Sequence, residues 1–320
     1  MRDVGYLRVG DTAEALTAAA RPGARLIAGG TELVNLLKER IEQPDLLVDI
    51  SRLPLTDITV GPDGLHLGAL ARMSDVAAHP EVRSGYPAIA QALELSASPQ
   101  LRNMATMGGN LMQRTRCPYF RADHDLPCNK RRPGSGCSAI DGDHRAAAIF
   151  GASESCVATH PSDLAVALVA LDAQVRTTAR TLPARDLHRL PGDQPHRDTV
   201  LDHGEMILGI DVPVSPPSAY LKVRERGSYE FALVSVAVAA ETSGGVIRTA
   251  RAALGGVAPK PWPLDVDLAG VPLRRDELRA AIAPAFAAAR PLPGSEFKIE
   301  LAQRAVVRAL TKPIGLMGET

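Results

Sequence analysis

The chain has few aromatic residues, no excess of charge and no long apolar run. Phe, Tyr and Trp make up 3% of its 320 residues, so its cores must be built from small aliphatic side chains. Lys plus Arg number 36, as do Asp plus Glu, which gives none of the basic bias that favours nucleic acid. No segment approaches the roughly 20 apolar residues of a membrane helix, and the first residues lack the apolar stretch of an export signal. We expect a soluble, cytoplasmic chain without a membrane span.

Motifs of hydrolytic chemistry are also missing. The sequence has no Ser–His–Asp arrangement and no H-E-x-x-H pair, and its eight scattered histidines indicate no site. The length exceeds what one core usually covers, which predicts two or three domains. Chemistry in such a chain is expected to come from a bound cofactor.

Cysteine is scarce, but all four residues fall within one 40-residue window: Cys117, Cys128, Cys137 and Cys156. Thiolates gathered in this way are typical ligands of iron–sulfur clusters or zinc, although the C-x10-C-x8-C-x18-C spacing matches no common pattern of either. Pro and Gly residues predict a long loop, and the basic run at 129–132 can offset the charge of a cluster or form a solvated patch. An iron–sulfur cluster, structural zinc and disulfides all remain open from the spacing.

Two pairs of adjacent glycines predict ligand-binding turns. The first, Gly29 and Gly30, lies between a strand at 25–28 and a helical pattern that leads to a second strand at 46–50. The second pair, Gly108 and Gly109, is flanked by a Thr hydroxyl and an Asn amide. Backbone N–H groups at such turns can approach a pyrophosphate, so the two turns can hold one dinucleotide between them. Two unrelated tight turns are the alternative.

Further along, the residues 160–163 (His-Pro-Ser-Asp) predict the start of a helix, and a role in capping that helix is one interpretation of Asp163. Prolines at 213, 216 and 217 mark a boundary. Strands are expected beyond it at 234–239 and 251–256, followed by Ala-rich helices at about 276–290 and 296–310.

The segments 26–33, 105–110 and 160–163 together resemble the FAD-contacting motifs of the flavin subunits of the xanthine oxidase family of molybdenum hydroxylases, in order and spacing along nearly the whole chain. The resemblance implies an α+β fold. A two-part FAD-binding domain of the PCMH type would span 1–214, with subdomains at about 1–55 and 56–214, and a smaller α+β flavoprotein domain would span 215–320. Within the family, the cysteine segment resembles the flavin subunit of bacterial PaoABC-type aldehyde oxidoreductases. This implies a [4Fe–4S] cluster in the loop 114–157, held by the four cysteines.

The resemblance also implies the residues that bind FAD. These are Leu26, Ile27, Ala28, Gly29, Gly30, Thr31, Glu32, Leu33, Ala105, Thr106, Gly108, Gly109, Asn110, Asp163 and Lys222. Without the resemblance, a single Lys on an alternating strand such as Lys222 is usually solvated. Tyr229 and Glu230 are expected to screen one flavin face. Glu32 stands where many relatives have Asp, so the identity of the side chains that line the flavin ring is left open.

The implied function is electron transfer within a molybdenum-dependent aldehyde oxidoreductase. Partners would be a large molybdenum-cofactor subunit and a small [2Fe–2S] subunit, in a heterotrimer or its dimer, together with an external electron acceptor. A partner with a twin-arginine signal would take the folded complex to the periplasm. A free-standing FAD-dependent oxidoreductase and a zinc-stapled scaffold without redox activity are the alternatives.

Overall fold

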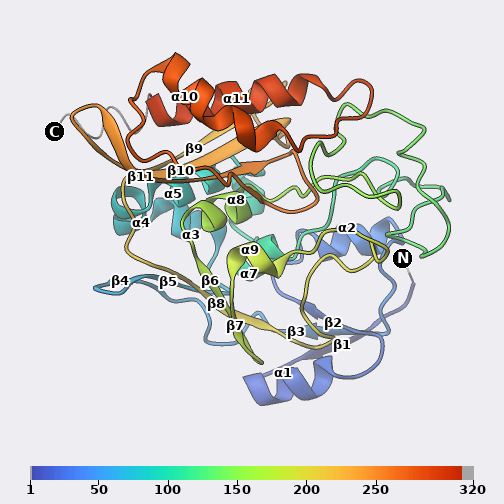
Figure 1. Cartoon of the computed structure of the whole chain (residues 1–320). Coiled ribbons are helices and arrows are strands. Elements are labelled where there is room, and N and C mark those ends of the chain that lie inside the picture. Colours follow the sequence, from blue (N-terminus) through green and yellow to red (C-terminus); the bar gives the residue numbers. More distant parts are fainter. Residues whose placement is uncertain (1, 312–320) are drawn as a thin grey trace.

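The computed structural model of the chain describes residues 2–311, in which strands form three sheets with helices between and beside them (Figure 1). The first sheet is parallel, with the order β1-β3-β2, and two short helices connect its strands. Alternation of strand and helix along the chain favours such parallel pairing. Its elements are β1 (Gly5–Arg8), α1 (Thr12–Ala19), β2 (Ala24–Ile27), α2 (Leu33–Lys38) and β3 (Leu46–Asp49).

The second sheet is antiparallel and has five strands in the order β4-β5-β8-β6-β7. Its strands are β4 (Ile58–Gly61), β5 (Gly64–Gly68), β6 (Gln174–Thr177), β7 (Thr181–Pro183) and β8 (Ile207–Val212). Between β5 and β8 the chain forms α3 (Met73–Ala78), α4 (Pro80–Gly85), α5 (Pro87–Glu94), α6 (Pro99–Arg102), α7 (Met107–Leu111), α8 (Asp163–Ala170) and α9 (Ala184–Leu187). The most buried of these helices, α5 and α8, share a core with the sheet.

The third sheet is antiparallel, with the order β12-β11-β10-β9. Helices α5 and α8 contact one side of it and α11 the other, so the small residues at 234–240 of β10 are buried on both faces (Figure 1). Its elements are β9 (Ser218–Val223), β10 (Val234–Ser243), β11 (Val246–Gly255), β12 (Trp262–Pro263), α10 (Arg275–Ile282), the 3-10 helix η1 (Ala283–Phe286) and α11 (Phe297–Ala309).

The predicted α+β class is confirmed, and so are the helices near residues 12 and 296 and the strand–turn–helix–strand unit. The predicted helix at 276–290 is too long: α10 ends at Ile282 and passes into η1. Pro284 supplies the physical reason, because it lacks the N–H that an α-helix requires.

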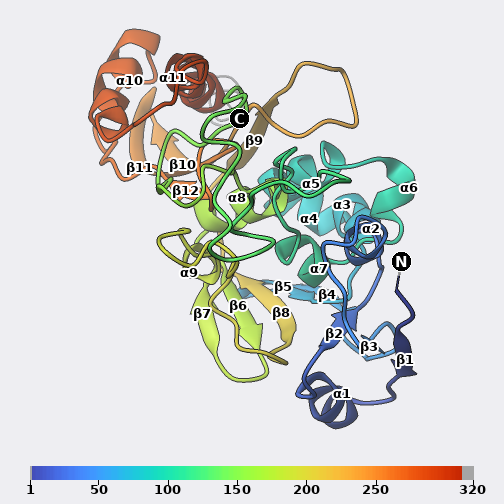
Figure 2. The same ribbon diagram turned by 90° about the vertical axis from the view of Figure 1, so that its right-hand side faces the viewer.

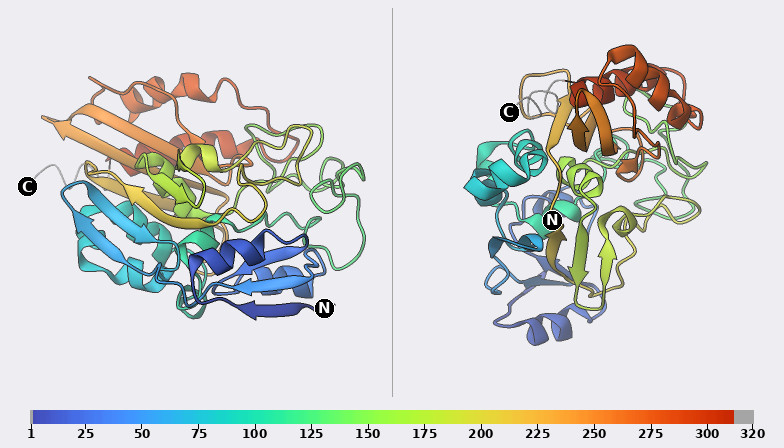
Figure 3. Two further views of the ribbon diagram at one scale, coloured as in Figure 1. Left: turned by 90° about the horizontal axis from the view of Figure 1, so that it is seen from below. Right: turned by 60° about the vertical axis from the view of Figure 1, so that its left-hand side comes forward.

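The segment 114–157, which we call the cysteine loop, contains no helix or strand among the described residues (Figure 2). From below, it projects beside the first sheet and the C-terminal helices (Figure 3). No helix in residues 2–311 is long and apolar enough to cross a membrane.

Candidate functional site: a glycine-lined cleft beside a cysteine loop

The two predicted glycine turns meet in one cleft with a volume of about 650 Å³. Of the residues predicted to bind FAD, eleven line it: Leu26, Ile27, Ala28, Gly29, Gly30, Thr31, Glu32, Leu33, Thr106, Gly108 and Gly109. The two turns thus line one cleft, as the prediction that they hold one dinucleotide between them requires. A cleft of this size lies within the range that cofactor sites usually occupy.

Glycine is required at both positions of the first turn, for different reasons. A Cβ on Gly29 would lie 1.8 Å from the carbonyl oxygen of Met104, so the first turn packs directly on the backbone that precedes the second. Gly30 has a φ of 70°, in the left-handed region that favours glycine. These constraints fix the first turn before any ligand binds.

Backbone donors differ between the two turns. Among the described residues, no protein oxygen accepts a hydrogen bond from the backbone N–H groups of residues 29–33. In the second turn, by contrast, the N–H of Gly108 donates to Ala69 (2.8 Å) and that of Gly109 donates to the hydroxyl of Thr106 (3.2 Å). Free N–H groups beside a cleft fit an anionic group such as a pyrophosphate. The first turn thus supplies the donors, and the second forms a wall.

Asp163 and Lys222 form a buried ion pair, with 2.8 Å between Nζ and Oδ2. Their side chains are 5% and 1% exposed, so the alternative of a solvated lysine is wrong. Tyr220 donates to the same carboxylate, and burial together with Asp163 raises the pKa of that phenol well above its ordinary value. The cap of α8 is Ser162, whose hydroxyl accepts from the N–H of Ala165. Asp163 is therefore free of the capping role.

Asn110 and Ala105, like Asp163 and Lys222, do not line the larger cleft. The amide of Asn110 is buried, where its oxygen accepts from Ser162 (2.6 Å) and its nitrogen contacts the sulfur of Met73 (3.3 Å). The carbonyl of Ala105 accepts from the N–H of Met73. Both residues position α7 rather than face the cleft.

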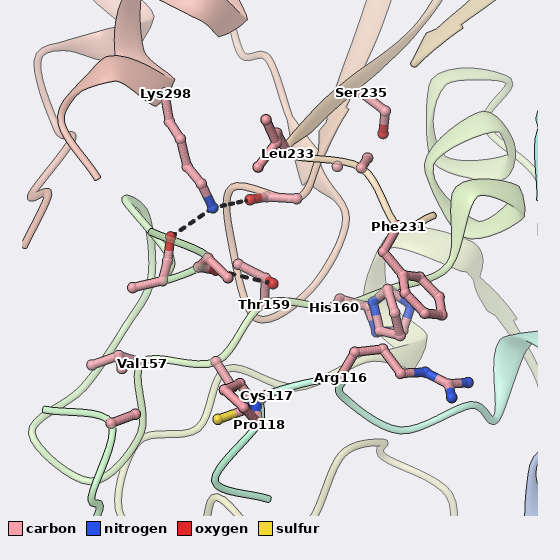
Figure 4. Close-up of a pocket in the computed structure, with 18 of the residues that line it drawn as sticks. Arg116, Cys117, Pro118, Val157, Thr159, His160, Phe231, Leu233, Ser235 and Lys298 are labelled. Carbon is pink, nitrogen blue, oxygen red and sulfur yellow. Dashed lines mark hydrogen bonds between the residues drawn. The ribbon is translucent and has the colours of Figure 1, made fainter. Parts of the chain in front are cut away.

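A second cavity, of about 250 Å³, connects the Asp163 region with the cysteine loop (Figure 4). Arg116, Cys117 and His160 line it from one side, and Lys298 of α11 lines it from the other. Lys298 donates to the carbonyls of Ala147 (2.9 Å) and Gly256, and burial lowers the pKa of its ammonium to about 8.

The two residues predicted to screen one flavin face, Tyr229 and Glu230, lie in different surroundings. Tyr229 is 55% exposed and does not line either cavity, whereas Glu230 and Phe231 line the smaller one. The guanidinium carbon of Arg116 lies 4.8 Å from the centroid of the Phe231 ring, a distance that permits a cation–π contact.

Three of the four cysteines of the cysteine loop share apolar surroundings. Cys117 packs with Cys128 against Leu36 and Phe120, and with Cys137 against Val157. The backbones of Cys128 and Cys137 pair as an isolated antiparallel β-bridge. The thiols of all four cysteines are free rather than disulfide-bonded. Across residues 2–311, no three His, Cys, Asp or Glu side chains are gathered closely enough to hold a metal ion.

Burial raises the pKa of two of the four thiols. It raises the pKa of Cys156 to about 11, against the opposing charge of Lys130, and it also raises the pKa of Cys117. Lys130 itself is buried and paired with Asp198, so the reading of this part of the basic run as a solvated patch is wrong. A cation that binds here has to displace protons from sulfur.

Sequence reasoning missed a pair of buried histidines. The rings of His160 and His188 lie with centroids 4.1 Å apart, the first at the smaller cavity and the second at the larger cleft. His160 Nε2 and His188 Nδ1 are buried, and neither has a hydrogen-bond partner within residues 2–311. Because the two residues are 28 positions apart and belong to no shared motif, no local signal could have found them.

Fold and cleft together are those of a flavin-binding oxidoreductase subunit. The chain superposes on carbon monoxide dehydrogenase from Hydrogenophaga pseudoflava with a TM-score of 0.75 at 24% identity, covering 98% of both chains. Residues 2–215 match the family described as the FAD binding domain in molybdopterin dehydrogenase, and residues 219–312 match the CO dehydrogenase flavoprotein C-terminal domain.

Curated relatives agree with these matches. The chain is 46% identical over 98% of both lengths to the aldehyde oxidoreductase FAD-binding subunit PaoB of Escherichia coli (strain K12). It is 28% identical to the glyceraldehyde dehydrogenase medium chain of Sulfolobus acidocaldarius, covering 81% of this chain and 78% of that one. The chain therefore belongs to the FAD-binding subunits of the xanthine oxidase family of molybdenum hydroxylases, as its motifs predicted.

Proposed function

We propose that the chain is the electron-transfer subunit of a molybdenum-dependent aldehyde oxidoreductase. It would take electrons from partner subunits, pass them through FAD and deliver them to an external acceptor. The observation that carries the proposal is the glycine-lined cleft with free N–H groups, in a chain 46% identical to an aldehyde oxidoreductase FAD-binding subunit. The partners would be a large molybdenum-cofactor subunit and a small [2Fe–2S] subunit.

Within this proposal, each part of the site has a separate task. When bound, FAD supplies the electron-accepting chemistry, and the protein supplies position and charge. The N–H groups of residues 29–33 would bind its pyrophosphate, and the wall at residues 106–109 would keep water out. Asp163 and Lys222 form a buried ion pair outside the glycine-lined cleft, with Asp163 at the smaller cavity, and would act on the cofactor by fixing α8 against β9. The division at residue 214 into a FAD-binding and a C-terminal domain forms part of the same proposal.

The cysteine loop, we further propose, holds a [4Fe–4S] cluster through its four thiols. Support comes from the confinement of all four cysteines to this loop, where Cys117 shares apolar surroundings with Cys128 and with Cys137. Thiolates are the usual ligands of such clusters. Lys130, buried beside Cys156, offers a charge that offsets the negative cluster.

The first test is the content of anaerobically purified protein. We expect released FAD and about four irons and four sulfides per chain, with no zinc. Replacing each cysteine separately by serine should remove the iron in all four variants and leave FAD in place. Zinc without flavin would favour the scaffold alternative instead.

Co-purification tests the partners. Expressed together with its proposed large molybdenum-cofactor and small [2Fe–2S] subunits, the chain should assemble with both and reduce its FAD upon addition of an aldehyde. If the isolated chain alone oxidised a substrate, the free-standing oxidoreductase would be correct. A Cys128→Ser variant that kept normal flavin reduction and acceptor turnover would assign the cluster a structural task rather than a relay.

A further inference from the structure

Glu32 links the two cofactor regions. It is the last residue before α2, and its backbone belongs to the first glycine turn. Its carboxylate, however, binds the segment that leads into the first cysteine. Arg116 donates to Oε2 at 2.6 Å, and the guanidinium of Arg121 and the backbone N–H of Arg114 donate to Oε1. The Glu32 side chain thus contacts two residues that precede Cys117 and one that follows it.

More ion pairs repeat the same connection. Glu39, just after α2, pairs with Arg121 at 3.0 Å, and Glu42 pairs with Arg114 at 2.7 Å. Arg114 also pairs with Asp198 at 2.6 Å. Carboxylates of the first domain region therefore neutralise the cations at the start of the cysteine loop.

An aromatic ring fills the space between the cations. Phe120 is fully buried against Leu36 of α2, and the guanidinium carbons of Arg114 and Arg121 lie 4.8 Å and 5.4 Å from its centroid. The loop cannot move away from α2 without uncovering this ring and separating the ion pairs.

Burial makes these pairs stiff. The side chains of Arg114 and Glu32 are 15% and 14% exposed. Desolvation would raise the pKa of Asp198, yet Arg114 and Lys130 outweigh it and lower that pKa. Buried charges that lose a partner are strongly destabilising, so the cations are expected to follow the carboxylates.

We propose that Glu32 is a positioning residue that couples occupation of the first glycine turn to the order of the 114–121 segment. The inference rests on the proposed function, since it assumes that FAD binds the turn. Coupling between two sites is reciprocal, so the cluster would in turn strengthen FAD binding.

Hydrogen–deuterium exchange of the full-length chain, with FAD and after its removal, tests this directly. FAD should slow exchange of the 114–121 amides by about fivefold or more, the lower end of ordinary coupling between sites. In Glu32→Gln this protection should disappear. Glu32→Asp, which keeps the charge but cannot reach both arginines, should lose most of it and serves if the first variant folds poorly.

Glu300→Gln is the matched control. Glu300 also contacts two arginines, Arg304 at 2.6 Å and Arg279 at 3.5 Å, but it lies on the exposed surface of α11. It should behave like the unchanged chain. Equal protection in all variants would overturn the coupling.

The same samples separate this inference from the proposed function. Failure of the unchanged chain to bind FAD would overturn both. Absence of iron would overturn only the cluster, because amide exchange reports the coupling without it. Where iron is present, its loss to a chelator should be faster in Glu32→Gln than in Glu300→Gln, and equal rates would contradict the coupling.

Discussion

The first glycine turn and the cysteine loop are both irregular segments of one site, but different forces shape them. The turn is short and follows a strand, and its conformation comes from a left-handed glycine and from close backbone packing. The cysteine loop is long, and side chains from three separate regions hold it in place. These are α2, the segment around Asp198, and the core beneath the third sheet.

Substitutions are therefore expected to affect the two segments differently. A change of one atom in the turn meets backbone, which cannot move aside. A change in the loop meets side chains that can rearrange, except where the side chain is itself part of a core. Ile149 and Phe150 are such residues, because they lie in the loop yet belong to the core of the third sheet.

Gly29→Ala should have the largest effect. Its Cβ would lie 1.8 Å from the Met104 carbonyl, so the two turns must separate. We expect a loss of roughly 3 kcal/mol or more in stability, and FAD affinity weaker by on the order of 100-fold. FAD titration and urea unfolding measure both. Gly85→Ala in α4, where a Cβ meets nothing within 4 Å, should change neither.

Phe150→Ala should come next. Phe150 is 2% exposed and stacks on Trp262 at 5.1 Å, so its truncation leaves a cavity that costs about 3–5 kcal/mol. Urea unfolding should show this loss, accompanied by reduced iron content, because the part of the loop before Cys156 is no longer anchored. Phe231→Ala, at a 45% exposed site, should cost far less. Similar losses in the two variants would contradict the anchoring role.

Acid should destabilise the site through the histidine pair. Burial lowers the pKa of His188 to about 4, although the Leu111 carbonyl and Asp198 oppose it, and burial, His188 and Lys130 lower the pKa of His160. Both histidines must gain protons on unfolding. Their contribution is complete above pH 6.5 and is lost as the pH falls toward 4, by up to about 1.4 kcal/mol per pH unit for each.

Unfolding free energies between pH 4.5 and 7.5 test this sign. His160→Phe removes one of the two groups and should make the dependence shallower, whereas His124→Gln at an exposed position should leave it unchanged. A dependence that is unaltered in His160→Phe would exclude the histidine from this role.

Thr106→Ala should have the smallest effect. The Thr106 hydroxyl accepts from the N–H of Gly109 and so caps α7 at the wall of the cleft. Loss of such a cap costs about 1 kcal/mol. FAD affinity should fall as well. Asp11→Ala removes the cap of α1, remote from the wall, and should cost similar stability without changing FAD affinity.

Sequence patterns predicted much of the site, but not its contacts. The strand–turn–helix unit, the start of α8 and the cysteine window all depend on residues close in the sequence, where glycine, serine and apolar spacing have direct conformational effects. The prediction of one helix over 276–290 was wrong because the Ala-rich pattern continues through Pro284, which an α-helix does not tolerate there. Tyr229 lies outside both cavities while its neighbour Glu230 lines the smaller one, because exposure of neighbouring residues in a loop follows no period.

The features that follow from neighbouring residues are therefore local: the turns, the capped helices, the family motifs and the confinement of cysteine to one loop. The pairing of Asp163 with Lys222, the contact of Glu32 with the cysteine loop and the approach of His160 to His188 arise only from packing of distant segments. The physical reason is distance along the chain. Backbone preferences act within a few residues, whereas a buried charge or imidazole acquires its neighbours only when separate segments pack together and exclude water.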